Sequence, residues 1–179
     1  MALVIITGPA HSGKTRFAEA LAGSAGMSTV TVVTGPEGLA GTSDVLAPRR
    51  PPSWRVVDCS RAESPTLEAL LEFATDRDAV VVDTLGSVLE HAAKGGKYEA
   101  AAQSMWTAII NTRALVIAVG EELGWSPEPT DPRLRTFRHV LASLAMQLGW
   151  NASRVYLVVN GFFVDLKANW RAIDPGGTV

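Results

Sequence analysis

The chain has 179 residues, of which 47% are hydrophobic and 19% charged, and a formal net charge of −2. This length suits one domain with a substantial core, and the composition is too apolar for a disordered chain. The charge argues against nucleic acid as a partner, and the single cysteine, Cys59, excludes an intrachain disulfide or a multi-cysteine metal site. No secretory signal and no apolar run long enough to cross a bilayer is visible, so we expect a cytoplasmic protein with no membrane span.

A glycine-rich loop follows the first predicted strand, residues 3–7, and precedes a helix predicted over 16–22. The loop consists of Gly8, Pro9, Ala10, His11, Ser12, Gly13, Lys14 and Thr15. Glycines allow backbone torsions that turn successive N–H groups toward a phosphate at the start of the helix. The lysine then reaches the outer phosphates, and the threonine hydroxyl is placed to ligate Mg²⁺. The alternative is a plain glycine turn, but the order of strand, loop and helix favours nucleotide binding.

Strands and helices then alternate to the end of the chain. We predict strands over 28–34, 54–58, 79–83, 115–119 and 154–159, helices over 65–75, 84–93, 99–111 and 133–148, and an antiparallel edge strand over 162–166 after a tight turn at Gly161. This order predicts an α/β, P-loop NTPase-like fold with a mainly parallel sheet and helices on both faces. We predict one nucleotide-binding domain over 1–167 and a C-terminal tail over 168–179. The loop over 35–53 is long enough to suggest a function or disorder.

Carboxylates at the ends of two predicted strands are further site candidates. Asp83 ends an apolar strand, where an acidic residue beside a phosphate loop commonly holds Mg²⁺; capping the next helix is the alternative. Glu121 and Glu122 follow the strand over 115–119, at the sheet edge where open α/β folds bind ligands. Two solvated loop acids are an equally good interpretation of this pair.

The chain resembles the bifunctional adenosylcobinamide kinase / adenosylcobinamide-phosphate guanylyltransferase family of cobalamin biosynthesis. The resemblance extends from Met1 to Lys167 and depends on the order and spacing of several motifs. They are Ser12-Gly13-Lys14-Thr15-Arg16-Phe17-Ala18-Glu19-Ala20, Arg50-Pro51-x-x-Trp54, Val82-Asp83-x-Leu85, Glu122-Leu123-Gly124, Pro129, Arg135-x-Phe137-Arg138 and Val155-x-Leu157-Val158-Val159-x-Gly161.

The resemblance implies a kinase that uses ATP or GTP to phosphorylate the aminopropanol hydroxyl of adenosylcobinamide, a corrinoid. It also implies transfer of GMP from GTP through a guanylylated histidine, and a homotrimer with sites near subunit boundaries. The residues from Gly8 to Thr15 would bind nucleotide, and Thr15 and Asp83 would hold Mg²⁺. Catalytic roles fall to Lys14, Asp83 and Glu122. Residues implied around the substrate or nucleotide are Arg50, Trp54, Glu122 and Arg135.

The chain departs from the family pattern at informative positions. The nucleotide-accepting histidine should lie four residues before Arg50, but this position is Leu46, and no histidine lies between His11 and His91. Because leucine carries no nucleophile, this speaks against guanylyl transfer by the family route. Glu121, His91, Ala145 and Met146 also replace amide side chains of the pattern.

Three interpretations therefore stay open. The chain is a kinase that acts on adenosylcobinamide, the same scaffold redirected to another small acceptor, or a catalytically silent nucleotide-binding subunit.

Overall fold

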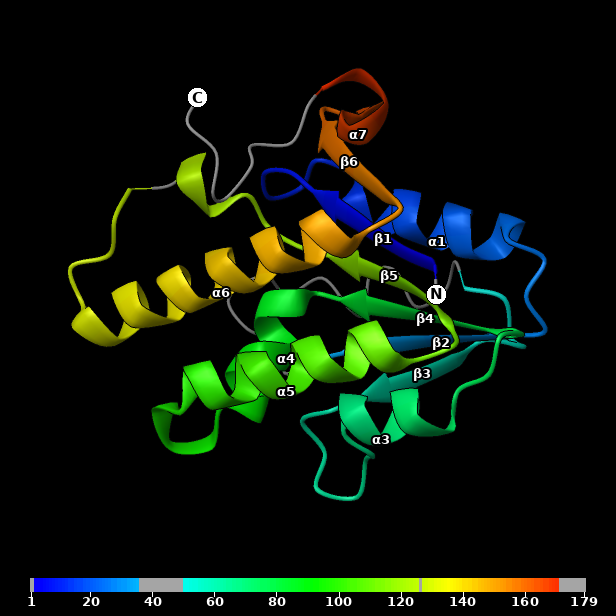
Figure 1. Cartoon of the computed structure of the whole chain (residues 1–179), viewed down its shortest axis with the longest axis horizontal. Coiled ribbons are helices and arrows are strands. Elements are labelled where there is room, and N and C mark those ends of the chain that lie inside the picture. Colours follow the sequence, from blue (N-terminus) through cyan, green and yellow to red (C-terminus); the bar gives the residue numbers. More distant parts are fainter. Residues whose placement is uncertain (1, 36–49, 126, 171–179) are drawn as a thin grey trace.

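All strands of the described chain belong to one sheet. The computed structural model describes residues 2–35, 50–125 and 127–170. The sheet has the order β3-β2-β4-β5-β1-β6-β7 (Figure 1). Neighbours from β3 to β6 are parallel, and β7 runs antiparallel to β6 at the edge, which confirms the predicted sheet. The strands are β1 (Ala2–Thr7), β2 (Thr29–Thr34), β3 (Arg55–Asp58), β4 (Asp78–Asp83), β5 (Leu115–Val119), β6 (Arg154–Val159) and β7 (Phe162–Asp165).

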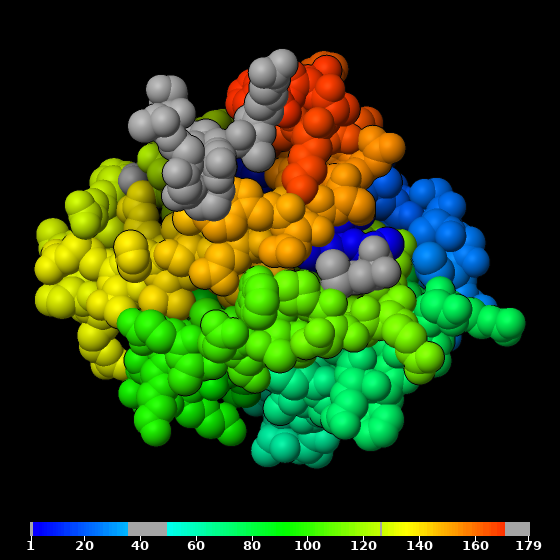
Figure 2. Space-filling model, viewed as in Figure 1, coloured from blue at the N-terminus to red at the C-terminus, as the bar shows by residue number. Residues whose placement is uncertain are grey.

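Helices cover both faces of this sheet, as predicted (Figure 1). One face packs against α1, and the opposite face packs against α3, α4, α5 and α6, with α5 and α6 side by side in Figure 2 (lime green, and yellow to orange). The helices are α1 (Lys14–Ser24), α3 (Leu67–Phe73), α4 (Leu85–Ala92), α5 (Tyr98–Asn111), α6 (Pro132–Asn151) and α7 (Leu166–Asn169), with 3₁₀ turns η2 (Lys94–Gly96) and η3 (Leu123–Trp125).

Successive side chains of each central strand enter different cores. In β1, Leu3 and Ile5 belong to the core beneath α3 to α6, whereas Ile6 belongs to the core beneath α1. In β4, Val80 and Val81 separate in the same way. Strands buried on both faces need apolar residues at every position, which explains the uninterrupted apolar runs of the sequence.

The carboxyl ends of the parallel strands lie at one edge, toward the left in Figure 1. The register pairs Val119 of β5 with both Ile6 of β1 and Asp83 of β4, so the glycine-rich loop and Asp83 emerge one strand apart. The peptide bond between Asp83 and Thr84 is cis, and Thr84 Oγ1 then caps α4 by accepting a hydrogen bond from Ser87 N at 3.4 Å. This edge positions the site.

Boundaries of several helices differ from the predicted ones because of caps. Thr66 Oγ1 accepts from Ala69 N, so α3 begins at Leu67 and not at residue 65. Asp131 Oδ1 accepts from Arg133 N at 2.7 Å and starts α6 at Pro132. At the other end of the chain, α7 continues through Asn169, into the first residues of the predicted tail. None of the helices in the described residues is long and apolar enough to cross a membrane.

Candidate functional site

The glycine-rich loop has the backbone shape that cradles a phosphate. Gly8 and Gly13 have φ angles of 151° and 101°, and His11, at 57°, also lies in the left-handed region. A Cβ on Gly8 would lie 2.1 Å from the Val158 carbonyl oxygen, so no other residue fits there. Gly13 caps α1, whose first N–H groups receive no side-chain cap. They are therefore available to an anion.

The turn between β6 and β7 supports this loop from the side. Asn160 and Gly161 have φ angles of 51° and 80°, as in the tight type I′ turn of a two-residue hairpin. Gly161 N donates a hydrogen bond to Ser12 O at 2.9 Å. The C-terminal hairpin thus fixes the part of the loop that precedes Lys14.

Lys14 is buried within the loop that it serves. It is 6% exposed, and its Nζ donates a hydrogen bond to Pro9 O at 2.6 Å. Burial lowers the pKa of the Lys14 ammonium, and the carboxylates of Glu121 and Asp83 oppose this shift. The Coulomb attraction between an ammonium and a phosphate oxygen is stronger away from water, so a buried Lys14 with one carbonyl partner is suited to bind phosphate.

Thr15 and Asp83 meet at the start of α1. Thr15 Oγ1 donates a hydrogen bond to Asp83 Oδ1 at 3.0 Å, although the residues are 68 positions apart. Burial raises the pKa of Asp83, an effect opposed by the hydrogen bond from Thr15 and the charge of Arg50. The two predicted metal-binding residues are therefore adjacent, and Asp83 is near enough to Lys14 for its charge to act on the ammonium.

Arg50 joins this cluster from the segment before β3. Its Nε donates to Glu19 Oε1 at 2.6 Å, and its Nη2 lies 3.8 Å from Asp83 Oδ2. The Arg50 side chain is only 4% exposed. Within the described residues, Arg50 Nη2 and Ser12 Oγ are buried polar atoms without a hydrogen bond. Buried polar atoms normally have a hydrogen-bond partner, so these two are groups that a ligand bound at the loop would satisfy.

Trp54, directly before β3, lies against an apolar core. Its ring packs in the core beneath α1, next to Gly23 in the last turn of that helix, and its backbone N–H donates to Pro51 O at 2.9 Å. Arg50 and Trp54 thus both lie on the α1 side of the sheet, but only Arg50 is beside the glycine-rich loop.

Glu122 links the loop to the opposite side of the sheet. Its backbone N–H donates to Gly8 O at 3.0 Å, and its carboxylate accepts from Thr7 Oγ1 at 3.5 Å and from Gly124 N at 3.3 Å. These contacts hold the carboxylate at the junction of β1, β5 and the glycine-rich loop. Glu121 is exposed beside it.

A cavity of about 820 Å³ begins at this junction and extends between the sheet and α6. Its walls are mostly apolar, with polar groups supplied by Glu121, Glu122, Glu128, Arg135, Arg138, His139 and Lys167. Three residues of this lining, Glu121, Glu122 and Arg135, were predicted from the sequence as site candidates, but the cavity was not predicted. The apolar lining carries no motif that could have indicated one, because alanines and aromatic residues on a helix are indistinguishable from core.

Two arginines of α6 hold the segment that forms the rim of the cavity. Arg135 donates to the carbonyl oxygens of Pro129 and Thr130, at 3.2 and 2.7 Å. Arg138 donates to Pro127 O at 2.6 Å and to Leu123 O. Hydrogen bonds from arginine side chains of α6 to backbone carbonyl oxygens therefore hold the rim, which also carries Glu122, against the helix.

The structure divides the predicted residues into two adjoining groups. Lys14, Thr15, Asp83 and Arg50 cluster on the α1 side, whereas Glu122 and Arg135 line the cavity on the other side of the sheet edge. His11 is exposed at the tip of the loop and His91 is half-buried in α4. Leu46 lies outside the described residues.

Comparison with known proteins assigns a family to this arrangement. Residues 4–166 match the model of the family described as cobinamide kinase / cobinamide phosphate guanyltransferase. Two similar proteins are each named bifunctional adenosylcobalamin biosynthesis protein CobU. The protein from Salmonella typhimurium is 27% identical over 188 residues and that from Escherichia coli K12 is 29% identical over 185, and each alignment covers 92% of this chain and 99% of the relative. The chain belongs to the cobinamide kinase / cobinamide phosphate guanyltransferase family.

Proposed function

We propose that this chain is a kinase of cobalamin biosynthesis that transfers the γ-phosphoryl group of ATP or GTP to the aminopropanol hydroxyl of adenosylcobinamide. The observation that carries the proposal is the buried Lys14 in an open phosphate-binding loop, beside the Thr15–Asp83 pair. The family match supports the corrinoid acceptor. By the family resemblance we also propose a homotrimer.

Thr15 and Asp83 fit a Mg²⁺ ion that accompanies the nucleotide. Their oxygens lie 3.0 Å apart, and a hydroxyl and a carboxylate are ligands that Mg²⁺ accepts together with phosphate oxygens. In the described part of the chain no group of three or more His, Cys, Asp or Glu side chains could hold a metal by itself. The nucleotide would thus complete the coordination, and a bound Mg²⁺ would neutralise charge on its phosphates.

Phosphoryl transfer depends mainly on positioning and charge neutralisation, which these residues supply. Lys14 would exchange its bond to Pro9 O for a phosphate oxygen, and the N–H groups at the start of α1 would bind the same phosphates. The acceptor oxygen then bonds to the γ-phosphorus, the bond to the β–γ bridging oxygen breaks, and the nucleoside diphosphate leaves. In this proposal Glu122 would orient the attacking hydroxyl and accept its proton, because Asp83 is already engaged by Thr15 and Arg50.

The second family reaction is not part of this proposal. Guanylyl transfer by the family route needs an imidazole, and residue 46 is leucine. His11 is an imidazole within the glycine-rich loop itself, so its replacement by alanine is one of the variants to label.

One observation favours a second candidate, a kinase for another small acceptor. Glu121, Ala145 and Met146, three of the positions that depart from the family pattern, line the same cavity. The glycine-rich loop, by contrast, keeps both glycines of its motif together with Lys14 and Thr15. A change of acceptor would alter the residues that line the cavity and leave the loop motif unchanged.

The test is to incubate the purified protein and Mg²⁺ with γ-³²P-ATP, and separately with α-³²P-GTP, with and without adenosylcobinamide. We expect γ-label on the corrinoid and no α-label on the protein. Lys14→Ala should lower the rate by at least about a hundredfold, the scale of losing one main charge-stabilising donor. Lys94→Ala, an exposed lysine in η2, is the matched control and should retain wild-type activity.

Each other outcome has a definite meaning. Acid-labile α-label on the protein would restore the two-step reaction, and loss of that label in His11→Ala would identify the nucleophile. Consumption of ATP or GTP with a different alcohol, and none with adenosylcobinamide, would select the second candidate. Tight nucleotide binding without any product would indicate a silent subunit.

A further inference from the structure

A stripe of small residues on α6 borders the cavity. Ala142, Ala145 and Gly149 recur at spacings of three and four and so form one stripe of the helix. This stripe lies beside the buried leucines through which α6 packs in the core, Leu141, Leu144 and Leu148. Ile5 and Ala118 add apolar lining from β1 and β5. The cavity has a volume of about 820 Å³, within the range of small-molecule binding sites, and opens to the surface along the exposed side of α6.

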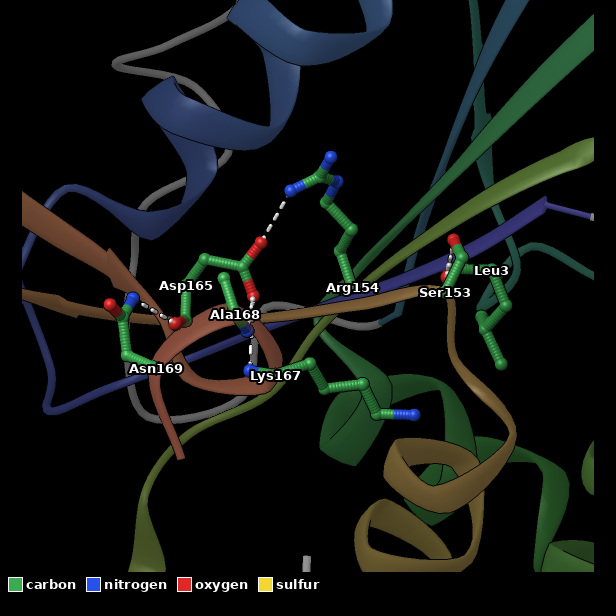
Figure 3. Close-up of polar contacts among 7 residues, drawn as sticks. All are labelled: Leu3, Ser153, Arg154, Asp165, Lys167, Ala168 and Asn169. Atoms are coloured by element: carbon green, nitrogen blue, oxygen red, sulfur yellow. Dashed lines mark hydrogen bonds and ion pairs between the residues drawn. The ribbon is translucent and has the colours of Figure 1, made fainter. Parts of the chain in front are cut away.

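The far wall of the cavity is formed by α7, and hydrogen bonds and an ion pair anchor this helix. Asp165 accepts hydrogen bonds from the first N–H groups of α7 and pairs with Arg154 at 2.6 Å (Figure 3). Lys167 extends from α7 toward α6 (Figure 3). Its Nζ donates to the carbonyl oxygens of Trp150 and Ala152, at 3.0 and 2.5 Å. These bonds fix Leu166 and Trp170, which line the cavity. The cavity thus has three separately anchored walls, the sheet, α6 and α7, and opens to the surface beside Met146 and Trp170.

The polar end of the cavity lies next to the phosphate-binding loop. Thr7 and Glu122 line the cavity. Thr7 directly precedes Gly8, the first residue of the loop, and the backbone N–H of Glu122 donates to Gly8 O. Glu128, Arg135 and His139 add polar groups at the same rim. A ligand in the cavity would therefore have an apolar body between α6 and the sheet and a polar arm beside Glu122.

We propose that this cavity receives the acceptor of the phosphoryl transfer, a bulky ring with polar side arms whose hydroxyl-bearing arm passes Glu122 toward the loop. The inference depends on the function proposed above and names its acceptor site. It assigns acceptor binding to the α6 side, apart from Arg50 and Trp54. Arg50 is committed to Glu19 and Asp83, and Trp54 packs under α1, so both lie on the face of the sheet opposite the cavity.

Binding measurements with cavity variants test this proposal. Ala145→Trp fills the cavity, and Met146→Glu places a charge on its wall at a residue that is already 53% exposed, where folding tolerates it. The probe is adenosylcobinamide, whose visible absorption reports its binding in equilibrium dialysis without any reaction. Affinity for ATP and GTP is measured in parallel with fluorescent nucleotide analogues. Ala100→Trp, at an exposed position of α5, is the matched control.

We expect both cavity variants to raise the dissociation constant and the KM for adenosylcobinamide by about tenfold or more. Their nucleotide affinity and melting temperature, and all properties of Ala100→Trp, should stay at the wild-type level. If Ala145→Trp and Met146→Glu both bind the corrinoid as the wild type does, while the wild type phosphorylates it, the cavity assignment is wrong and the kinase function stands. A wild-type protein that neither binds nor phosphorylates adenosylcobinamide would overturn the proposed function itself.

Discussion

The charge cluster around Arg50 shows how a single residue connects the elements on the α1 side of the candidate site. Arg50 is almost fully buried between Glu19 on α1 and Asp83 on β4, so it connects elements on two sides of the loop. Removing one partner of a buried ion pair leaves the others uncompensated. We therefore expect Arg50→Met to lower the free energy of unfolding by about 3 kcal/mol in urea denaturation.

A double-mutant cycle separates this charge effect from simple loss of packing. Adding Glu19→Gln to Arg50→Met removes the stranded carboxylate and should recover part of the loss. Arg55→Met, at an exposed arginine of β3, is the control and should change the unfolding free energy by less than about 0.5 kcal/mol. Strictly additive effects of Arg50→Met and Glu19→Gln would show that the pair contributes nothing to stability.

Asp78 provides a pH-dependent prediction far from the site. Its carboxylate accepts hydrogen bonds from Thr75 N and Thr75 Oγ1, both at 2.7 Å, and these bonds lower the pKa of Asp78 below its ordinary value of 3.8. A lowered carboxyl pKa stabilises the fold above the unfolded-state pKa, and this contribution is lost as the pH falls through the folded-state value. Asp78→Asn should thus cost about 1 kcal/mol at neutral pH.

The difference between wild type and Asp78→Asn should begin to shrink as the pH falls below the unfolded-state pKa of about 3.9, and it should level off below the lower folded-state pKa, where both side chains are uncharged in both states. Urea denaturation over a pH series measures it. Asp76→Asn, in the same turn but exposed, should track the wild type at every pH. A wild-type to Asp78→Asn difference that stays constant into acid would contradict a role for the charge.

At the scale of elements, the β6–β7 hairpin and the phosphate-binding loop form one unit through Gly161 and Ser12. Gly161→Val would strain a residue at φ 80° and displace the N–H that binds Ser12 O. Gly95→Val imposes similar strain at φ 73° in η2, where a Cβ would meet nothing within 4 Å. Both variants should lose about 1–2 kcal/mol of stability. Only Gly161→Val should weaken nucleotide binding, measured with fluorescent ATP and GTP analogues, and equal weakening in both variants would contradict the coupling.

The rim of the cavity depends on α6 in a comparable way. Arg138 donates to the carbonyl oxygens of Leu123 and Pro127, so Arg138→Met should release the rim that carries Glu122. We expect the KM for adenosylcobinamide to rise and the nucleotide affinity to stay unchanged, with about 1 kcal/mol lost in stability. Arg133→Met, an exposed arginine on the same helix, is the control. An unchanged KM in Arg138→Met would mean that the rim keeps its place without this arginine.

Considering the whole molecule, local pattern was sufficient to predict the fold and the position of Asp83 beside the glycine-rich loop. Apolar β-branched runs ending in Gly8 and Asp83 predicted parallel strands, and parallel strands bring their carboxyl ends to one edge, so the contact of Thr15 with Asp83 followed. The cavity could not be predicted from local pattern, because it depends on how α6 crosses the sheet and on where α7 packs. Arg50 and Trp54 were predicted from family resemblance alone, which does not specify the side of the sheet on which a residue lies.

Nucleotide binding should stabilise the molecule as a whole, since the loop contacts α1, β4, β6 and the rim at once. A ligand at about 100 times its dissociation constant adds ~2.7 kcal/mol to the free energy of unfolding. For a domain of this size each kcal/mol raises the melting temperature by about 2–4 °C, which predicts a shift of about 5–10 °C with ATP or GTP and Mg²⁺. Lys14→Ala should abolish most of the shift. If Thr15 and Asp83 hold the metal, EDTA should reduce the shift in the wild type but not in Asp83→Asn, which already lacks the carboxylate. A full shift in Lys14→Ala would mean that the nucleotide binds elsewhere, and an identical EDTA effect in Asp83→Asn would remove Asp83 from the metal site.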